Sequence, residues 1–236
     1  MSAQEAKVLN LIPVTQPSQT GPVSETRLSP RGLAEATEHQ PVVRGLRLSR
    51  ESFLKGDWFI VDATRRGPEL RVLLRPGQVS ITAREREILE AVLKGEPDRD
   101  LSLRLGITRQ CVCGHLGNAL TKIGAETRFA ALQTWRTIIE LEKGRRGRAM
   151  MAEVRFGEET LLSLRSPIAP RAELEVRLSA AETHVAWLVT DGASNRDIAL
   201  SRGTAERTVA NQVASIFTKL ELSRRFDVGQ FVLGLR

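Results

Sequence analysis

The spacing of hydrophobic and polar positions predicts a mainly helical chain. Between 82 and 129 the apolar residues recur three and four positions apart, the period of a helix with one buried face. Glycines follow where a helix needs a left-handed C-terminal residue. The first predicted helix buries Ile88, Leu89, Val92 and Leu93. A short helix over Asp98–Leu105 and a longer helix from about Thr108 follow, the latter burying Val112, Leu116, Ala119, Leu120 and Ile123.

The same pattern recurs 97 residues further along, because 82–129 aligns with 179–226 without a gap. Each copy opens with a hydroxyl residue three positions before a glutamate, Thr82 before Glu85 and Ser179 before Glu182. This is the pattern of a capping box, in which the two side chains satisfy backbone N–H groups at a helix start. The chain therefore contains two copies of one helical unit. The second short and long helices are predicted over Asn195–Arg202 and from about Ala205.

Residues before each helical unit favour a β-hairpin. Over 53–76, β-branched and aromatic runs flank Gly67-Pro68. A weaker pattern places Val154–Phe156 and Leu161–Leu164 around a turn at 157–159. Because a lone two-stranded hairpin is unstable in water, we expect each to pack on neighbouring helices or on a second subunit. A ligand pocket at the hairpin is the alternative.

These patterns predict a fold that is mainly α with minor β, with two tandem helix-turn-helix modules of four helices, each preceded by a small hairpin. The predicted parts are a disordered, proline-rich tail over 1–45, a first unit over 46–150 and a second over 151–236. A docking segment that orders on a partner is the alternative for the tail. The first unit ends in a fourth helix over Phe129–Lys143 and a basic linker, Gly144–Arg148.

Motifs within the two copies point to one family. The first copy contains Ile81-Thr82-Ala83-Arg84-Glu85, Leu105-Gly106-Ile107-Thr108, Val112, His115, Lys122-Ile123-Gly124 and Thr127-Arg128. The second contains Leu178-Ser179, Glu182, Ile198-Ala199, Thr208-Val209, Lys219-Leu220 and Arg224-Arg225. Each copy resembles the LuxR-type (NarL/FixJ class) helix-turn-helix DNA-binding domain. The resemblance implies that the third helix of each copy enters a DNA major groove, and that the fourth helix offers a dimerisation surface. Simple packing of the fourth helix on the third is the alternative.

The candidate DNA contacts lie on or beside the two third helices. Arginine can pair with guanine, glutamine and asparagine with adenine, and glutamate with cytosine. The candidate set is Thr108, Arg109, Gln110, Val112, Cys113, His115, Lys122, Glu206, Arg207, Thr208, Val209, Asn211, Gln212 and Lys219. Spacing alone would leave these as ordinary exposed side chains, and the assignment depends on the resemblance.

Both copies depart from the family pattern where DNA contacts are expected. The family lysine after threonine-valine is replaced by Cys113 and Ala210, and the family histidine, present as His115, is replaced by Gln212. Glycines at 114 and 117 permit close approach to a backbone or mark a weakened helix. A second function therefore stays open, that of an interaction or anti-regulator protein whose modules have lost DNA binding.

The net charge of +7 is unevenly distributed. Residues 41–150 carry 21 basic and 13 acidic residues, whereas residues 151–236 carry 11 of each. An excess of basic residues favours a polyanion such as double-stranded DNA. We therefore expect the first unit to bind DNA at least about tenfold more tightly than the second.

Other function classes find little support in the sequence. Cys111, Cys113 and His115 alternate along one helix, so their side chains cannot gather around one ion. The three histidines are scattered, and no acid–base pair or phosphate loop suggests an enzyme or a cofactor. With neither a signal peptide nor a long apolar run, the chain is expected in the cytoplasm of a prokaryote and away from membranes. Expected partners are double-stranded DNA, RNA polymerase or another regulator, and a second copy as a homodimer.

Overall fold

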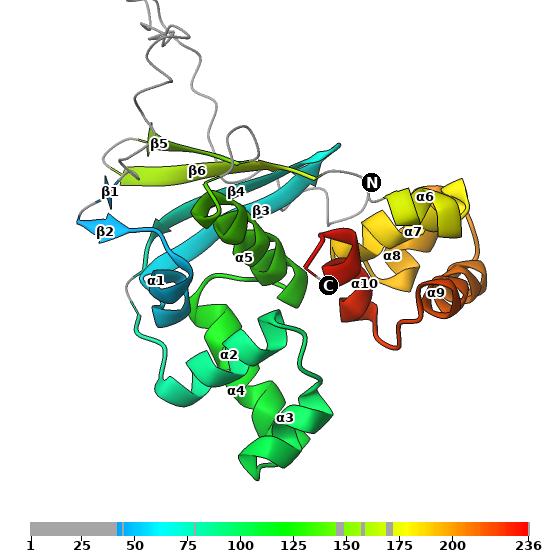
Figure 1. Cartoon of the computed structure of the whole chain (residues 1–236), viewed down its shortest axis with the longest axis horizontal. Coiled ribbons are helices and arrows are strands. Elements are labelled where there is room, and N and C mark those ends of the chain that lie inside the picture. Colours follow the sequence, from blue (N-terminus) through cyan, green and yellow to red (C-terminus); the bar gives the residue numbers. More distant parts are fainter. Residues whose placement is uncertain are drawn as a thin grey trace, which may run out of the picture. The chain divides into compact units, whose positions relative to one another are not determined.

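A computed structural model describes residues 42–43, 45–77, 79–144, 149–156, 159–168 and 172–235. Most of the predicted tail, four of the five residues of the basic linker and the turn at Gly157-Glu158 lie outside the described residues. Within those ranges the chain is mostly helical with a small antiparallel sheet (Figure 1). The predicted fold class is therefore confirmed.

The helices and strands follow one another in two similar series. The first comprises β1 (Val42–Val43), β2 (Leu46–Arg47), α1 (Arg50–Lys55), β3 (Trp58–Arg66), β4 (Glu69–Pro76), α2 (Ala83–Leu93), α3 (Asp98–Leu105), α4 (Arg109–Lys122) and α5 (Arg128–Glu142). The second comprises β5 (Met150–Phe156), β6 (Glu159–Pro167), α6 (Ala172–Arg177), α7 (Ala180–Thr190), α8 (Asn195–Arg202), α9 (Glu206–Leu220) and α10 (Arg225–Val232). The predicted bounds of α3 and α8 match those observed.

The sequence predicts two hairpins, each packed on neighbouring helices or on a second subunit. In the structure the two hairpins join into one four-stranded sheet. Its strand order is β3-β4-β6-β5, and every neighbouring pair is antiparallel. The second strands of the hairpins form the junction, where Leu73 lies opposite Ser163 and Leu74 opposite Leu162. The boundary predicted between 150 and 151 falls inside β5. The pairing removes the instability of a lone hairpin, because each gains a partner strand.

One face of this sheet is covered by α5 and α1. Figure 1 shows α5 lying along the sheet, and this helix contacts β3, β4 and β6. Leu70 and Leu164, one from each hairpin, are fully buried in the same core as Leu132 and Ile138 of α5. The second hairpin thus shares a hydrophobic core with the first helical module.

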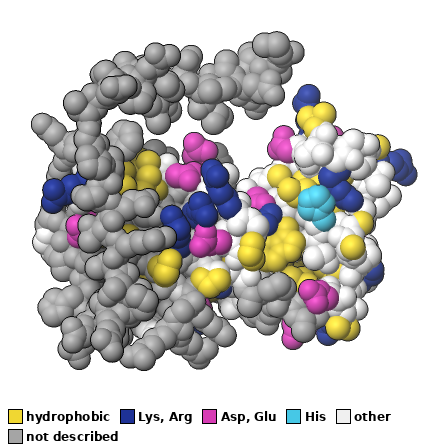
Figure 2. Space-filling model, turned by 90° about the horizontal axis from the view of Figure 1, so that it is seen from above, with side chains coloured by type: hydrophobic (Ala, Val, Ile, Leu, Met, Phe, Trp, Pro, Cys, Tyr) yellow, Lys and Arg dark blue, Asp and Glu magenta, His cyan; other side chains and the backbone are white. Residues whose placement is uncertain are grey.

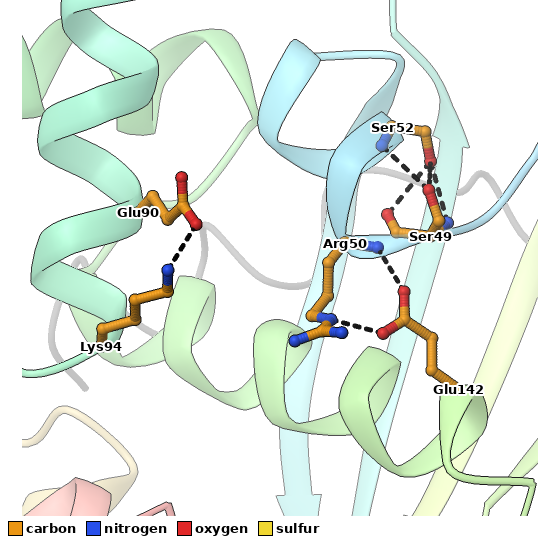
Figure 3. Close-up of polar contacts among 6 residues, drawn as sticks. All are labelled: Ser49, Arg50, Ser52, Glu90, Lys94 and Glu142. Carbon is orange, nitrogen blue, oxygen red and sulfur yellow. Dashed lines mark hydrogen bonds and ion pairs between the residues drawn. The ribbon is translucent and has the colours of Figure 1, made fainter.

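Two short helices were missed by the sequence prediction, α1 and α6. In α1, Ser49 and Ser52 form a capping box, and the left-handed Gly56 ends the helix at φ 85°. Figure 3 shows Arg50 meeting Glu142 at the end of α5, where the carboxylate accepts from the Arg50 backbone N–H (2.8 Å) and from its guanidinium. This contact fixes α1 against α5.

Each helical module begins with the predicted capping box. The Thr82 hydroxyl accepts from the Glu85 N–H, and the Glu85 carboxylate accepts from the Thr82 N–H. Ser179 and Glu182 make the same pair of bonds. Gly106 and Gly203, at φ 64° and 61°, form the left-handed turns after α3 and α8. The second module encloses its own core, formed by Val185, Ile198, Val209, Ile216 and Val228 among others.

Arg136, on α5, is a buried charged residue that connects three parts of the chain. Its guanidinium donates to the Ser166 hydroxyl (2.6 Å) and to the Pro167 carbonyl (3.0 Å) at the end of β6. It also donates to the Leu233 carbonyl (3.1 Å) just after α10. The side chain therefore joins the first module, the sheet and the second module.

We predict that Arg136→Ala lowers the free energy of unfolding by about 2 kcal/mol or more, because it leaves buried acceptors without donors. Arg66→Ala is the control, since the Arg66 side chain is exposed and makes no ion pair or hydrogen bond with any residue that the structure describes. The control should change stability by less than about 0.5 kcal/mol. Urea unfolding measures both variants, and equal losses would contradict the role given to Arg136.

Candidate nucleic-acid interface

The third helix of each module is held by the same ion pair. Lys122 near the end of α4 donates to Glu85 (2.7 Å), and Lys219 near the end of α9 donates to Glu182 (2.7 Å). The glutamate is in each case the capping-box residue of the module's first helix. These two lysines, predicted as DNA contacts, therefore brace the module as well.

Electrostatics at the two glutamates follow from these contacts. Hydrogen bonds from Lys219 and then Ser215 lower the pKa of Glu182 to about 2. Burial alone would raise the pKa of Glu85, but the bonds from Lys122 and Thr82 outweigh burial, and the pKa is lowered. Both carboxylates are therefore charged at neutral pH.

The outward face of α4 carries most of the first group of predicted contacts. Thr108 caps the helix by accepting from the Cys111 N–H (3.2 Å). Arg109, Gln110 and Cys113 are exposed, and His115 is half-buried. Cys113 and Arg109 line a cleft of about 350 Å³ that Arg99 of α3 and Arg224 of the second module also border. The polar N-terminal end of α4 is thus open to a ligand.

The outward face of α9 carries the second group. Glu206, Arg207, Thr208 and Asn211 are exposed. Gln212 is half-buried, where its carbonyl oxygen accepts from Arg202 (2.7 Å). The side chains of Arg109 and Arg207 make no ion pair or hydrogen bond within the described part of the chain. Both guanidiniums are therefore available to an outside acceptor.

Two of the predicted DNA contacts are wrong, because their side chains are buried. Val112 and Val209 have no exposed surface and lie in the cores of their modules. They occupy the inward face of the helix, one turn from Leu116 and Val213, so they position the helix and cannot touch a groove.

The glycines of α4 have no packing role in the described structure. A Cβ atom added at Gly114 or Gly117 would meet no described atom within 4 Å. Both residues are exposed on the face that carries Gln110 and Cys113. Glycine inside a helix costs about 1 kcal/mol relative to alanine. The fold therefore does not require these glycines.

The two modules meet through an exchange of equivalent contacts. The Gln133 amide of α5 donates to the Thr190 carbonyl at the end of α7 (3.0 Å). The Gln230 amide of α10 donates to the Leu93 carbonyl at the end of α2 (3.1 Å). Gln230 follows Gln133 by 97 residues, and Thr190 follows Leu93 by the same interval. Each module thus gives the other the same hydrogen bond.

Ring and backbone contacts complete this interface. Phe129 and Phe226, again 97 residues apart, pack with ring centroids 5.6 Å apart. Gly95 leaves room for Gln230, since a Cβ there would lie 2.6 Å from the amide oxygen. Arg65 of β3 pairs with Asp191 (2.5 Å) and stacks on Trp187, which ties the second module to the sheet. Sequence reasoning missed this set, although Phe129 and Gln133 are among the few fourth-helix residues kept in both copies.

The basic excess of the first half does not lie in its helical module. Residues 79–134 hold eight basic and seven acidic residues, and residues 176–232 hold seven and six. Figure 2 draws the molecule from above Figure 1, and on that face basic and acidic side chains lie side by side. The net charges of the two modules are therefore nearly equal and do not explain the expected difference in DNA affinity between the two units.

A family model described as bacterial regulatory proteins, luxR family, matches the chain at residues 79–134 and again at 176–232. Both modules belong to the luxR family. The matched segments contain α2, α3 and α4 of the first module and α7 to α10 of the second. Each LuxR-type module is therefore, in general terms, a DNA-binding regulatory domain.

Other comparisons add no relatives, since no curated protein and no solved structure matches the chain. Among the described residues, no helix has both the length and the apolar character needed to cross a bilayer.

We predict that the Glu182–Lys219 pair stabilises the second module only at pH values where the carboxylate is charged. Because the folded-state pKa lies near 2, below its ordinary value of 4.5, this stabilisation is present above pH 4.5 and is lost as the pH falls toward 2. Lys219→Met should lower the free energy of unfolding at pH 7, and the deficit should shrink by pH 3. Urea unfolding at both values tests this, and a deficit independent of pH would contradict it.

Proposed function

We propose that this chain is a sequence-specific regulator of transcription that binds double-stranded DNA through α4 and α9. The observation that carries the proposal is that both helices bury an apolar face and leave their polar N-terminal ends exposed. The recognition helix of a helix-turn-helix contacts base edges with its N-terminal residues. Family membership supports DNA binding by both modules.

Chemistry at the exposed ends fits base recognition. Arg109 and Arg207 are free to make paired hydrogen bonds to guanine, while Gln110 and Asn211 can pair with adenine. Thr108 and Arg99 can contact phosphates and set the register, whereas Arg128 and Arg224 beside the same cleft are paired with Asp98 and Asp227. We assign Lys122 and Lys219 a mainly structural role, because each is held by a carboxylate.

The interface between modules makes one chain resemble a dimer. Linking two modules raises the effective concentration of the second once the first has bound. We propose that α4 and α9 occupy neighbouring half-sites in this way. Such a regulator would act in the compartment that holds the chromosome. Its protein partner there would be RNA polymerase or another regulator.

We predict that the full chain binds duplex DNA with an affinity that falls steeply between about 50 and 200 mM salt, because counterions are released from phosphates. Arg109→Ala and Arg207→Ala should each weaken binding to a selected sequence by about 1–3 kcal/mol. Arg66→Ala removes the same charge from the sheet and serves as the control. Fluorescence anisotropy measures all four proteins, and salt-insensitive or undetectable binding would favour an interaction protein instead.

We predict opposite effects on stability and on binding for Gly114→Ala and Gly117→Ala. Each should raise the free energy of unfolding by about 1 kcal/mol, since alanine is the better helix former and has open space. Each should also weaken DNA binding, because the added methyl group faces the groove. The matched control is Ala214→Gly, which reverses the change at the equivalent of Gly117 and should destabilise α9. Tighter binding by the alanine variants would show that the glycines merely weaken the helix.

A further inference from the structure

We infer that the DNA site of this chain is an inverted pair of two different half-sites, bound by a single chain. The inference rests on the proposed function and specifies the DNA that α4 and α9 read together. Three features of the molecule carry it: the exchange of contacts between modules, the burial of the residues that make it, and the divergence of the exposed helix faces.

The exchange of contacts determines the relative direction of the half-sites. Gln133 contacts the first helix of the second module, and Gln230 contacts the first helix of the first module at the equivalent carbonyl. Such reciprocity defines a two-fold relation, because residue i contacts j and j contacts i. A translation from one module to the next would leave one of the two glutamines facing away. Since operator symmetry mirrors protein symmetry, the half-sites are inverted and not directly repeated.

The same residues show that one chain is sufficient. Gln133 and Gln230 are only 3% and 2% exposed, so their amides are already used inside the chain. Phe129 and Phe226 contact each other rather than a second copy. The fourth-helix surfaces that would join two separate chains are therefore occupied, and the complex contains one chain on each operator. This replaces the homodimer expected from the sequence.

The exposed faces of α4 and α9 show that the half-sites differ. Every exposed residue of α4 from Arg109 to Asn118 has a different residue at the equivalent position of α9. These residues and their equivalents are Arg109/Glu206, Gln110/Arg207, Cys111/Thr208, Cys113/Ala210, Gly114/Asn211, Gly117/Ala214 and Asn118/Ser215, of which only Ser215 is half-buried. Among the supporting residues, Val112/Val209 and Lys122/Lys219 are identical, whereas Leu116/Val213 and Ala119/Ile216 differ but remain apolar. Divergence therefore includes every exposed position of α4 between Arg109 and Asn118, whereas the exposed pair Thr121/Thr218 near the C-terminal end is identical.

The first pair of equivalent residues, Arg109 and Glu206, favours different bases in the two half-sites. Arg109 donates hydrogen bonds and suits guanine, whereas Glu206 accepts them and suits the amino group of cytosine. One turn along, Asn211 can pair with adenine, while Gly114 offers no side chain. The same base sequence cannot satisfy both helices.

Selection of duplexes from a random library by the full-length chain tests the inference. The expected result is an enriched site with two unlike half-sites in inverted orientation, spaced by about one helical turn. Native mass spectrometry should show one chain on each duplex. Replacing either half-site with an inverted copy of the other should weaken binding at least about tenfold, since each mismatched base pair costs about 1–3 kcal/mol.

Exchange of the reading residues provides a second test in the full chain. Glu206→Arg, Arg207→Gln and Asn211→Gly together give α9 the residues of α4, and the enriched site should become more palindromic. The reverse set, Arg109→Glu, Gln110→Arg and Gly114→Asn, should produce a palindrome of the other half-site. The reverse set replaces a glycine within α4 by a better helix former. A change in the enriched site for this variant therefore cannot be attributed to a less stable helix.

The outcomes separate this inference from the proposed function. A palindrome, a direct repeat or two chains on each duplex, found with the unsubstituted protein, would overturn the inference and leave DNA binding intact. Enriched sites that do not change in either exchanged variant would also overturn it. If no sequence is enriched over the starting library, the proposed function itself fails.

Discussion

The arrangement of the two modules depends on hydrogen bonds that complete helix ends. The last carbonyls of any helix lack partners within that helix. Here the carbonyl that ends α2 accepts from Gln230, and the carbonyl that ends α7 accepts from Gln133. Because both amides are buried, loss of either contact would leave a polar group without a partner in the interior. Each module therefore supplies the hydrogen-bond donor for a helix end of the other module. The orientation of α4 relative to α9 follows from this pair of contacts.

The sheet provides a second, independent connection between the copies. Pairing of β4 with β6 places residues from both hairpins in the core beneath α5. Arg136 then links the end of β6 to the residue that follows α10. The described part of residues 40–236 therefore forms one compact unit, although its two LuxR-type modules enclose separate cores. This explains why a division by sequence at 150/151 cuts through a strand.

Local signals in the sequence were sufficient for the helical modules, whereas long-range pairings were not visible in it. The signals that bound α3 and α8 act within a few residues, since Pro97 precedes α3, Ser194 caps α8, and Gly106 and Gly203 end the two helices. The pairing of Leu73 with Ser163 joins residues far apart in the chain, and no local pattern encodes it. In the candidate site, Val112 was counted as both a core residue and a DNA contact. The helical period already favoured the core, and the burial agrees with the period.

Under the proposed function, one chain carries both recognition helices, and this changes how recognition can evolve. In a protein made of two identical chains, a single mutation alters both reading surfaces at once, so the DNA must change in both halves to match. Here a mutation at Arg207 leaves Arg109 unchanged, because the two residues are encoded separately. One half of the contact can then drift toward a new sequence while the other half retains the old one. The identical supports, such as Lys122 and Lys219, remain constrained by the fold of each copy.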